Sequence, residues 1–345
     1  MLNEKIKSDL MKIVVQEYID WTAFDKKTVL ITGATGLIGA ELVNTFLYVR
    51  TNKNIDCNVI AFVRNTEKAK RLFDVDAVTI YQGDLESIPY FPERIDYIIH
   101  CANPTSSKWF IEYPVETIKT AINGTLEMLE VARRNRVDSF LFLSSMEVNG
   151  TPDKGHKVAI DEGGSFDTQI VRNCYPLSKQ ICENACVAYS SEYGVNAKVI
   201  RLTQTFGPGV DYNDGRVFAE FARCAIEKKN IVLKTKGETE RSYLYLSDAI
   251  TAIIITLLKG KNGEVYTAAN EDTYCSIYNM AKLVADRYGI DINIKIDDVS
   301  KYGYANTLYM DLDTSKLKTL GWKPTTDLKT AFDNLIEYMK GEKNE

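Results

Sequence analysis

The sequence contains few groups that bind metal ions. It has two histidines and seven cysteines among 345 residues, and no cysteines form a CxxC pair. Zinc sites are built mainly from cysteine and histidine at short, paired spacings. Cys182 and Cys186 lie four residues apart on a predicted helix, but the sequence offers them too few partners. We therefore expect no metal site, and we interpret the cysteines as buried, reduced thiols of a cytoplasmic protein.

Long apolar runs and basic tracts are also missing. No stretch of about 18 apolar residues occurs, and the first residues lack the apolar segment of a secretory signal peptide. The formal net charge is −5. These features argue against a membrane partner and against a nucleic-acid partner. They predict a soluble, cytoplasmic protein.

Length and composition allow a substantial core. A chain of 345 residues suits one large or two moderate domains, and 45% of the residues are apolar. Between Leu2 and Phe24, apolar residues recur at helical spacing. We expect residues 1–26 to form an extra helix ahead of the main domain.

A glycine-rich turn follows the first apolar strand of that domain. Residues 29–43 read VLITGATGLIGAELV, in which three glycines at intervals of three interrupt an apolar run. The pattern predicts a strand, a tight turn and a helix whose N-terminus holds a diphosphate. Gly33 would make the turn, Gly36 would let the diphosphate approach the backbone, and Gly39 would let the helix pack on the strand. The alternative is an ordinary strand and helix whose loop contains glycines.

Strands and helices alternate beyond this turn. We expect strands at 29–32, 59–63, 77–81, 95–101 and 140–144, and helices from Leu37 and at 115–135 and 177–193. Such alternation specifies a parallel sheet with helices on both faces. The predicted fold class is α/β, with a Rossmann-type doubly wound parallel sheet.

Three strand ends carry residues suited to a dinucleotide. The second strand ends at Arg64, where an acidic residue would favour NAD and an arginine suits the 2′-phosphate of NADP. Asp84 follows the third strand, where a carboxylate could meet the adenine amino group, and Ala102 follows the fourth. Arg64 favours NADP, although a solvated loop arginine is the alternative. The expected cofactor is therefore NAD or NADP.

A tyrosine and a lysine lie at helical spacing after the fifth strand. Tyr175 and Lys179 are separated by four residues, so on a helix they face the same side. A nearby ammonium lowers the pKa of a phenol and so prepares it for proton transfer. Ser145, at the end of the fifth strand, could share that proton. The alternative is an amphipathic helix with a half-buried tyrosine and an exposed lysine.

These motifs together resemble the extended short-chain dehydrogenase/reductases that act on nucleotide sugars, the NAD-dependent epimerase/dehydratase family. The resemblance rests on TGATGLIG, GDL at 83–85, the SS pair at 144–145 and YPLSK at 175–179, and it extends from Thr28 to about Tyr338. The segments HCANPTSSKWFIEYPVETIKTAINGTLEML and FGPGVDYNDGRVFAEF look most similar to UDP-glucuronate decarboxylases, with dTDP-glucose 4,6-dehydratases next.

The resemblance implies a second, smaller α/β domain that binds the substrate. It implies a dinucleotide domain at 27–208, completed by 240–270, and a substrate domain at 209–239 and 271–345. The expected cofactor-binding residues are Gly33, Thr35, Gly36, Leu37, Ile38, Gly39, Arg64, Asp84, Leu85, Ala102, Tyr175 and Lys179. The expected substrate-binding residues are Asn123, Gln204, Asn213, Arg216 and Arg241. A homodimer through the helices at 115–135 and 177–193 is also implied.

The implied chemistry is oxidation of the sugar at C4 by a bound nicotinamide, with Ser145, Glu147, Tyr175 and Lys179 as catalytic residues. Dehydratases carry an Asp-Glu pair beside the serine, whereas this chain has Met146 and Glu147. Met310 stands where decarboxylases carry an arginine that meets the substrate carboxylate. A decarboxylase- or dehydratase-type lyase is our leading hypothesis. A 4-epimerase, an NADPH-consuming 4-ketoreductase and a non-catalytic nucleotide-binding regulator remain alternatives.

Overall fold

A parallel sheet organises the larger part of the molecule. The computed structural model describes residues 2–296 and 307–343. Seven of the described strands pair in the order β11-β7-β5-β4-β1-β2-β3, all parallel. Their bounds are β1 Thr28–Thr32, β2 Asn58–Val63, β3 Thr79–Gln82, β4 Tyr97–His100, β5 Ser139–Ser145, β7 Ala197–Leu202 and β11 Val265–Ala268. This arrangement confirms the predicted Rossmann-type α/β class.

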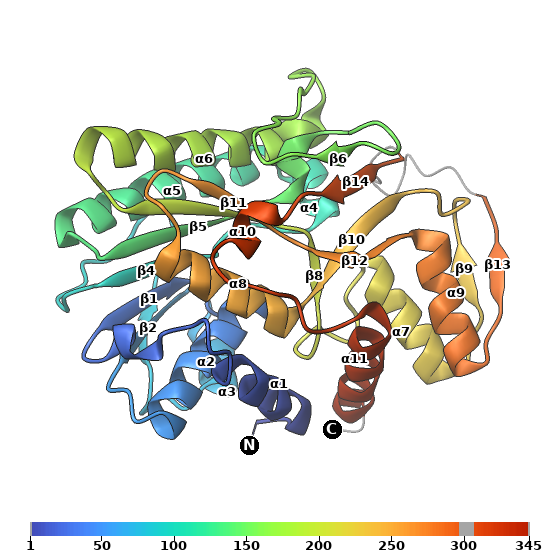
Figure 1. Cartoon of the computed structure of the whole chain (residues 1–345), viewed down its shortest axis with the longest axis horizontal. Helices are drawn as coiled ribbons and strands as arrows, with labels where there is room; N and C mark the ends of the chain where they lie inside the picture. Colours follow the sequence, from blue (N-terminus) through green and yellow to red (C-terminus); the bar gives the residue numbers. More distant parts are fainter. Residues whose placement is uncertain (1, 297–306, 344–345) are drawn as a thin grey trace.

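Helices cover both faces of the sheet, because alternate residues of each strand point to opposite sides. Val29 and Ile31 of β1 share one core with α2 (Leu37–Asn52) and α8 (Leu246–Lys259). Leu30 lies in another core with α5 (Pro114–Asn135) and α6 (Cys174–Tyr193). Figure 1 shows α5 and α6 on one side of the sheet and α2 and α8 on the other. The short helix α3 spans Thr66–Leu72.

A smaller unit of the molecule is built around a second sheet. It runs in the order β12-β10-β14-β6, with β8 paired to β10. The bounds are β6 Lys157–Val158, β8 Gln204–Phe206, β10 Glu240–Tyr245, β12 Asn270–Ser276 and β14 Tyr309–Leu312. A separate pair joins β9 (Ile231–Leu233) to β13 (Ile292–Ile294), and the helices here are α7 Val217–Glu227, α9 Ile277–Tyr288, α10 Ser315–Lys318 and α11 Leu328–Lys343. Of the range 240–270, α8 and β11 belong with the large sheet, whereas β10 lies in the second.

The N-terminal helix is shorter than its periodicity predicts. Helix α1 spans Glu4–Val14, and a separate 3₁₀ turn, η1, spans Trp21–Phe24. The helix prediction through Phe24 was therefore wrong in extent, because the apolar period continues across a break between two elements. The Asp20 side chain caps η1 by accepting a hydrogen bond from the Thr22 amide.

Helix α1 connects elements of both parts of the chain. It packs on α2 and α8, and its Lys5 forms an ion pair of 2.7 Å with Glu337 of α11. Asp9 of α1 is buried and accepts a hydrogen bond of 2.5 Å from the Tyr245 hydroxyl. Glu41 of α2 is buried beside it, and burial together with the Asp9 charge raises the pKa of Glu41 to about 8.

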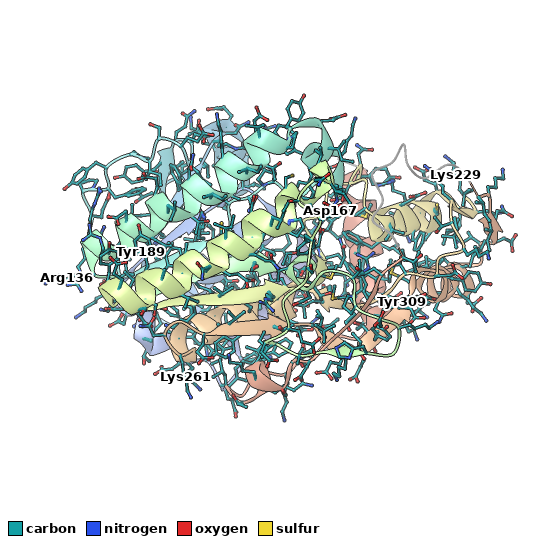
Figure 2. All side chains as sticks on the ribbon, turned by 90° about the horizontal axis from the view of Figure 1, so that it is seen from above. Arg136, Asp167, Tyr189, Lys229, Lys261 and Tyr309 are labelled. Atoms are coloured by element: carbon teal, nitrogen blue, oxygen red, sulfur yellow. The ribbon has the colours of Figure 1, made fainter. Side chains whose placement is uncertain are left out.

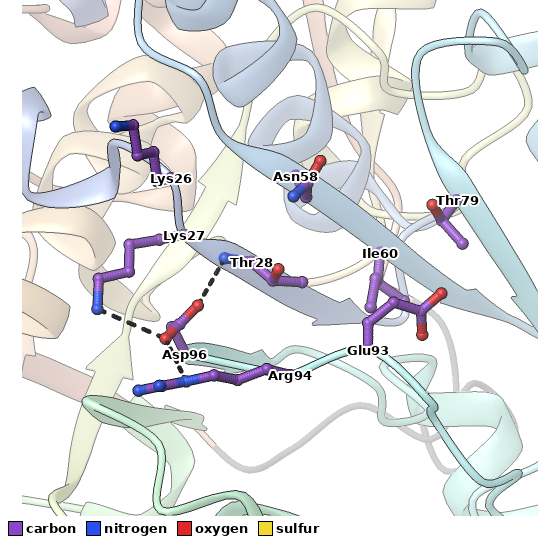
Figure 3. A pocket seen from close by; sticks show the side chains of 9 residues that line it. All are labelled: Lys26, Lys27, Thr28, Asn58, Ile60, Thr79, Glu93, Arg94 and Asp96. Atoms are coloured by element: carbon purple, nitrogen blue, oxygen red, sulfur yellow. Dashed lines mark hydrogen bonds and ion pairs between the residues drawn. The ribbon is translucent and has the colours of Figure 1, made fainter.

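A polar hollow of about 470 Å³ lies at the opposite end of β1 from the glycine turn, around Asp96 (Figure 3). The Asp96 carboxylate accepts a hydrogen bond from the Thr28 amide at 2.9 Å and pairs with Lys27 and Arg94. These contacts tie the starts of the strands together. Within the described residues, no helix is long and apolar enough to cross a bilayer.

Candidate active site

A cavity of about 570 Å³ lies at the carboxyl ends of the parallel strands. It is lined by the glycine turn, by residues that follow β2, β3, β4 and β5, and by the start of α6. Sixteen of the expected site residues line it: Gly33, Thr35, Gly36, Leu37, Ile38, Gly39, Arg64, Asp84, Leu85, Ala102, Ser145, Glu147, Tyr175, Lys179, Gln204 and Arg216. The fold therefore brings the predicted cofactor-binding and catalytic residues to one place. In open parallel sheets, ligands bind at the carboxyl ends of the strands.

The glycine turn leaves a space beside the backbone, and side chains at the three glycine positions would intrude on it or on the packing around it. We call this space the glycine cradle. Gly33 has a φ of +64°, and a Cβ there would lie 2.8 Å from Ala102 Cα. At Gly39 a Cβ would lie 2.3 Å from the Gly33 carbonyl oxygen, so only glycine allows α2 to pack here. A Cβ at Gly36 would meet only that oxygen, at 3.3 Å, and Gly36 is exposed as the N-cap of α2. The helix N-terminus is thus open to a diphosphate.

The end of the cavity next to β2 is cationic. Arg64, Asn65 and Lys68 line it, and all three are exposed. Asp84 is also exposed, and its carboxylate accepts a hydrogen bond from the Glu86 amide at 3.1 Å. No acidic residue stands at the end of β2 itself, which ends Phe62-Val63. Two cations at this position suit a 2′-phosphate better than a free ribose.

Asn103, after β4, lines the cavity, and the amide nitrogen and oxygen of its side chain are buried. Neither its amide nitrogen nor its oxygen has a hydrogen-bond partner among the described residues. A buried amide without hydrogen-bond partners costs free energy. A bound ligand that supplies hydrogen bonds to Asn103 would remove this cost. His100, three residues earlier at the end of β4, has a contact at each ring nitrogen instead. Thr32 contacts its Nδ1 at 2.8 Å, and burial lowers the pKa of His100 to about 3.

Ser145, Tyr175 and Lys179 meet in the centre of the cavity. The Ser145 hydroxyl hydrogen-bonds the Tyr175 phenol, and the Lys179 ammonium lies 5.9 Å from the centre of the tyrosine ring. Lys179 is buried and donates a hydrogen bond of 2.6 Å to the Leu143 carbonyl. Burial lowers the pKa of Lys179 to about 8.

The surroundings of Tyr175 favour the protonated phenol. Burial and the Glu147 charge raise the pKa of Tyr175, and the hydrogen bond with Ser145 and the charge of Arg172 only partly oppose them. The Lys179 ammonium is directed to the Leu143 carbonyl rather than to the phenol oxygen. These surroundings therefore hold the pKa of the phenol above its usual value.

Glu147 is held by an arginine that the sequence motifs did not indicate. Arg172 donates a hydrogen bond of 2.8 Å to the Glu147 carboxylate, and its guanidinium lies 5.1 Å from the centre of the Phe110 ring. Phe110 in turn stacks on the Tyr175 ring, with centroids 4.2 Å apart and planes at 11°. Arg172 thus connects the carboxylate and the phenol from behind the cavity.

A buried ion pair fixes the strand end that carries Ser145. Arg201 of β7 forms a two-pronged pair with Glu183 of α6, and both side chains are at most 10% exposed. Glu183 also accepts a hydrogen bond of 2.5 Å from the hydroxyl of Ser144. Arg201 donates to Asn149, which ends the 3₁₀ turn η2 (Met146–Asn149) that presents Glu147.

Comparison with known proteins identifies the family. The model of the NAD dependent epimerase/dehydratase family matches residues 29–270, more than half of the chain. The chain belongs to this family. It is 27% identical over 323 residues to UDP-glucuronic acid decarboxylase 1 of Xenopus tropicalis, which covers 92% of this chain and 73% of the relative.

Solved structures of the epimerase/dehydratase family share the fold. The UDP-glucose 4-epimerase of Thermotoga maritima aligns with a TM-score of 0.78 at 22% identity, over 91% of this chain and 99% of that one. A dTDP-glucose 4,6-dehydratase of Bacillus anthracis, solved in complex with NAD, aligns with a TM-score of 0.76 at 18% identity, over 92% and 98%. The resemblance read from the motifs is confirmed, and the protein is an NAD(P)-dependent enzyme of this family.

Three expected substrate-binding residues do not line the cavity. Asn123 is exposed on α5, because the buried face of that helix runs through Ala121, Gly124 and Thr125. Asn213 is exposed in the loop before α7. Arg241 lies in β10 behind Gln204 and donates a hydrogen bond of 3.3 Å to its side chain. The α5 residue that does line the cavity is Thr120.

Arg216, an expected substrate-binding residue, is already paired. It forms a two-pronged contact with Asp214, at 3.0 and 2.6 Å. Burial raises the pKa of Asp214, but the Arg216 charge and hydrogen bonds outweigh it, so that pKa lies below its usual value. Asp214 thereby presents the guanidinium at the rim of the cavity.

The cysteines are free thiols in the described structure, and those at 182 and 186 are buried in α6. The described residues contain no group of three or more metal-binding side chains. Cys101 lines the cavity, and burial raises its pKa, so its thiol stays protonated.

Proposed function

We propose that the protein is a nucleotide-sugar enzyme that oxidises the sugar at C4 with a bound nicotinamide cofactor. The observation that carries this proposal is one cavity that joins a glycine cradle for a diphosphate to Ser145, Tyr175 and Lys179. The unpartnered Asn103 amide and the open Gly36 support a dinucleotide in this cavity. The relatives named as nucleotide-sugar enzymes support the substrate class.

Each residue of the central group has a role in proton transfer. The Tyr175 phenol accepts the proton of the sugar hydroxyl, and Ser145 orients that hydroxyl. Lys179, which lines the cavity, would supply positive charge there and hold the nicotinamide ribose. A bound, oxidised nicotinamide would supply the acceptor for the hydride of C4, and its positive charge would favour the ionised phenol.

Glu147 decides what happens to the ketone at C4. Oxidation at C4 makes the neighbouring C5–H acidic, and it makes a carboxylate at C6 labile. A carboxylate beside Ser145 can move or shield the proton concerned, so we propose a lyase of the decarboxylase or dehydratase type. The ion pair with Arg172 supports this role, because it fixes the Glu147 carboxylate in place.

A 4-epimerase is the second candidate, and Met146 is the observation that favours it. A thioether cannot protonate a leaving hydroxyl, so the acid that a dehydratase needs is missing from this position. In a 4-epimerase the hydride leaves and returns at C4 alone, and Glu147 has no chemical step to perform.

The experiment mixes the enzyme with UDP-, dTDP-, CDP- and GDP-sugars and follows the nicotinamide by absorbance. A lyase or epimerase gives product without net consumption, a 4-ketoreductase consumes NADPH, and a regulator changes neither. Glu147→Gln keeps the shape and removes the base, so in a lyase it stops product while hydride transfer remains visible. Glu4→Gln, an exposed carboxylate on α1, is the control. Normal turnover of Glu147→Gln would favour the epimerase.

We also propose a homodimer through α5 and α6. These helices lie side by side over one face, as Figure 2 shows, and the hydroxyl of Tyr189 on α6 bonds Glu130 of α5 at 2.9 Å. Their outer faces expose apolar side chains at Val115, Ile118, Leu126, Ile181 and Val187. Such a patch suits a two-fold packing of four helices. Sedimentation velocity of wild type and Ile181→Glu tests this, and a wild-type monomer would contradict it.

A further inference from the structure

The end of the cavity beside Tyr175 has an apolar wall. Met146 lies between Ser145 and Glu147, lines the cavity and is 5% exposed. It belongs to a buried cluster that contains Met310 of β14 together with Val158, Ala269, Leu308 and Leu312. The Thr203 hydroxyl, which also lines the cavity, donates to the Ser242 carbonyl at 2.6 Å and approaches the Met146 sulfur at 3.3 Å. This wall therefore offers no charge, and its nearest hydroxyl is already engaged.

Apart from Lys179, the cations that line the described part of the cavity lie at its other end or along its rim. Arg64 and Lys68 line the end next to β2. Arg216 is held at the rim by Asp214. These positions suit the phosphates of a cofactor and of a nucleotide, rather than a group on the sugar.

The cations nearest to the apolar wall each make at least one hydrogen bond, although the buried Nε atoms of Arg172 and Arg241 have no partner among the described residues. Lys179 donates to the Leu143 carbonyl, and Arg172 is paired with Glu147 and does not line the cavity. Arg241 is separated from the cavity by Gln204. A negative charge placed beside Met146 would thus lose its water, meet no cation among the residues of the apolar wall, and face the like charge of Glu147.

We propose that the substrate carries an uncharged group, hydroxymethyl or methyl, on the sugar carbon next to C4, and that the site rejects uronates. The proposal rests on the proposed function, because that function places C4 at Tyr175. The substituent of C5 then lies next to the reacting centre, between Met146 and Glu147. Within the lyase hypothesis, this selects proton removal at C5 of a neutral sugar over loss of a carboxylate.

Like charges a few ångströms apart at a partly buried site repel enough to change affinity on the order of 100-fold. The test measures dissociation constants by calorimetry on the NAD-saturated enzyme for matched pairs that differ only at C6, beginning with UDP-glucose and UDP-glucuronate. Because both members carry the same nucleotide, their ratio isolates the C6 group. We expect the neutral member to bind on the order of 100-fold more tightly.

Two variants locate the source of the preference. Glu147→Gln removes the carboxylate charge that repels a uronate. It should reduce the ratio of the two dissociation constants at least tenfold. Asp214→Asn, which frees Arg216 at the rim, should change both affinities by the same factor and leave the ratio as it is. A ratio near one, or tighter binding of the uronate, would overturn the proposal. These outcomes are read from binding, so they stand apart from failure of the proposed function, which would appear as no hydride transfer with any sugar.

Discussion

The glycine cradle permits a paired test that separates cofactor binding from folding. Gly36→Ala places a methyl group at the open N-cap of α2, where the backbone angles, φ −79° and ψ 170°, are allowed for alanine. We expect it to fold with a loss of less than about 1 kcal/mol from the altered cap. The methyl group projects into the cavity and should displace one or two charge-assisted hydrogen bonds from a diphosphate. Each contributes about 1.5–3 kcal/mol, so dinucleotide affinity should fall at least tenfold.

Gly39→Ala is the matched variant, three residues along the same helix. Its Cβ would lie 2.3 Å from the Gly33 carbonyl oxygen and 2.9 Å from the Ala34 Cα, which are backbone atoms that cannot rotate away. We expect this variant to lose about 1–3 kcal/mol of stability or more, with a lower melting temperature. Calorimetric titration with NAD and NADP, and thermal unfolding without cofactor, measure the two effects. A folded Gly36→Ala protein with wild-type affinity would refute the cradle, and an unchanged melting temperature of Gly39→Ala would refute the packing.

Three further predictions address the reaction, the cofactor and the buried acids. Tyr175→Phe should lower kcat by about 10²–10⁴-fold with little change in substrate affinity, because the phenol acts in the transition state. Near-normal turnover of this variant would show that Tyr175 is not the proton-transfer residue. Arg64→Ala should reduce a preference for NADP by about one to two decades, and equal affinities in the wild type would remove that argument. Glu41 keeps its proton in the folded protein up to a pKa of about 8, whereas the unfolded chain ionises near 4.5. Its contribution to stability should therefore fall by about 1.4 kcal/mol per pH unit between these values. Glu41→Gln should flatten that fall in melting temperature from pH 5 to 8, and a wild-type slope in the variant would contradict the buried proton.

Local patterns predicted the parts of the site that are local in sequence. The strand, glycine turn and helix from Thr28 to Asn52 follow from an apolar run whose period changes at Gly33. Helix α5 begins at Pro114, one residue before the predicted start. Proline suits the first position of a helix, where its missing N–H has no helical partner to lose. The parallel sheet then follows from alternation, since few topologies satisfy it.

Contacts across the fold could not be predicted in this way. Arg172 lies 25 residues from Glu147, in a 3₁₀ turn that has no amphipathic period, so no spacing indicates their pairing. The pKa of Tyr175 depends on burial by Phe110 and other distant residues, which a helical interval does not report. The exposure of Asn123 depends on which face of α5 the sheet covers.

The second sheet has a consequence for how the protein forms during synthesis. Its strands come from positions as far apart as β6 at Lys157–Val158 and β14 at Tyr309–Leu312, which pair directly. The strands that carry the glycine turn and Ser145 are all complete by residue 145. A ribosome releases the chain from its N-terminus, and pairings between distant segments are slow to close. We therefore expect the nascent chain to acquire its dinucleotide-binding end early, whereas the wall that holds Met310 closes only after nearly the whole chain has emerged.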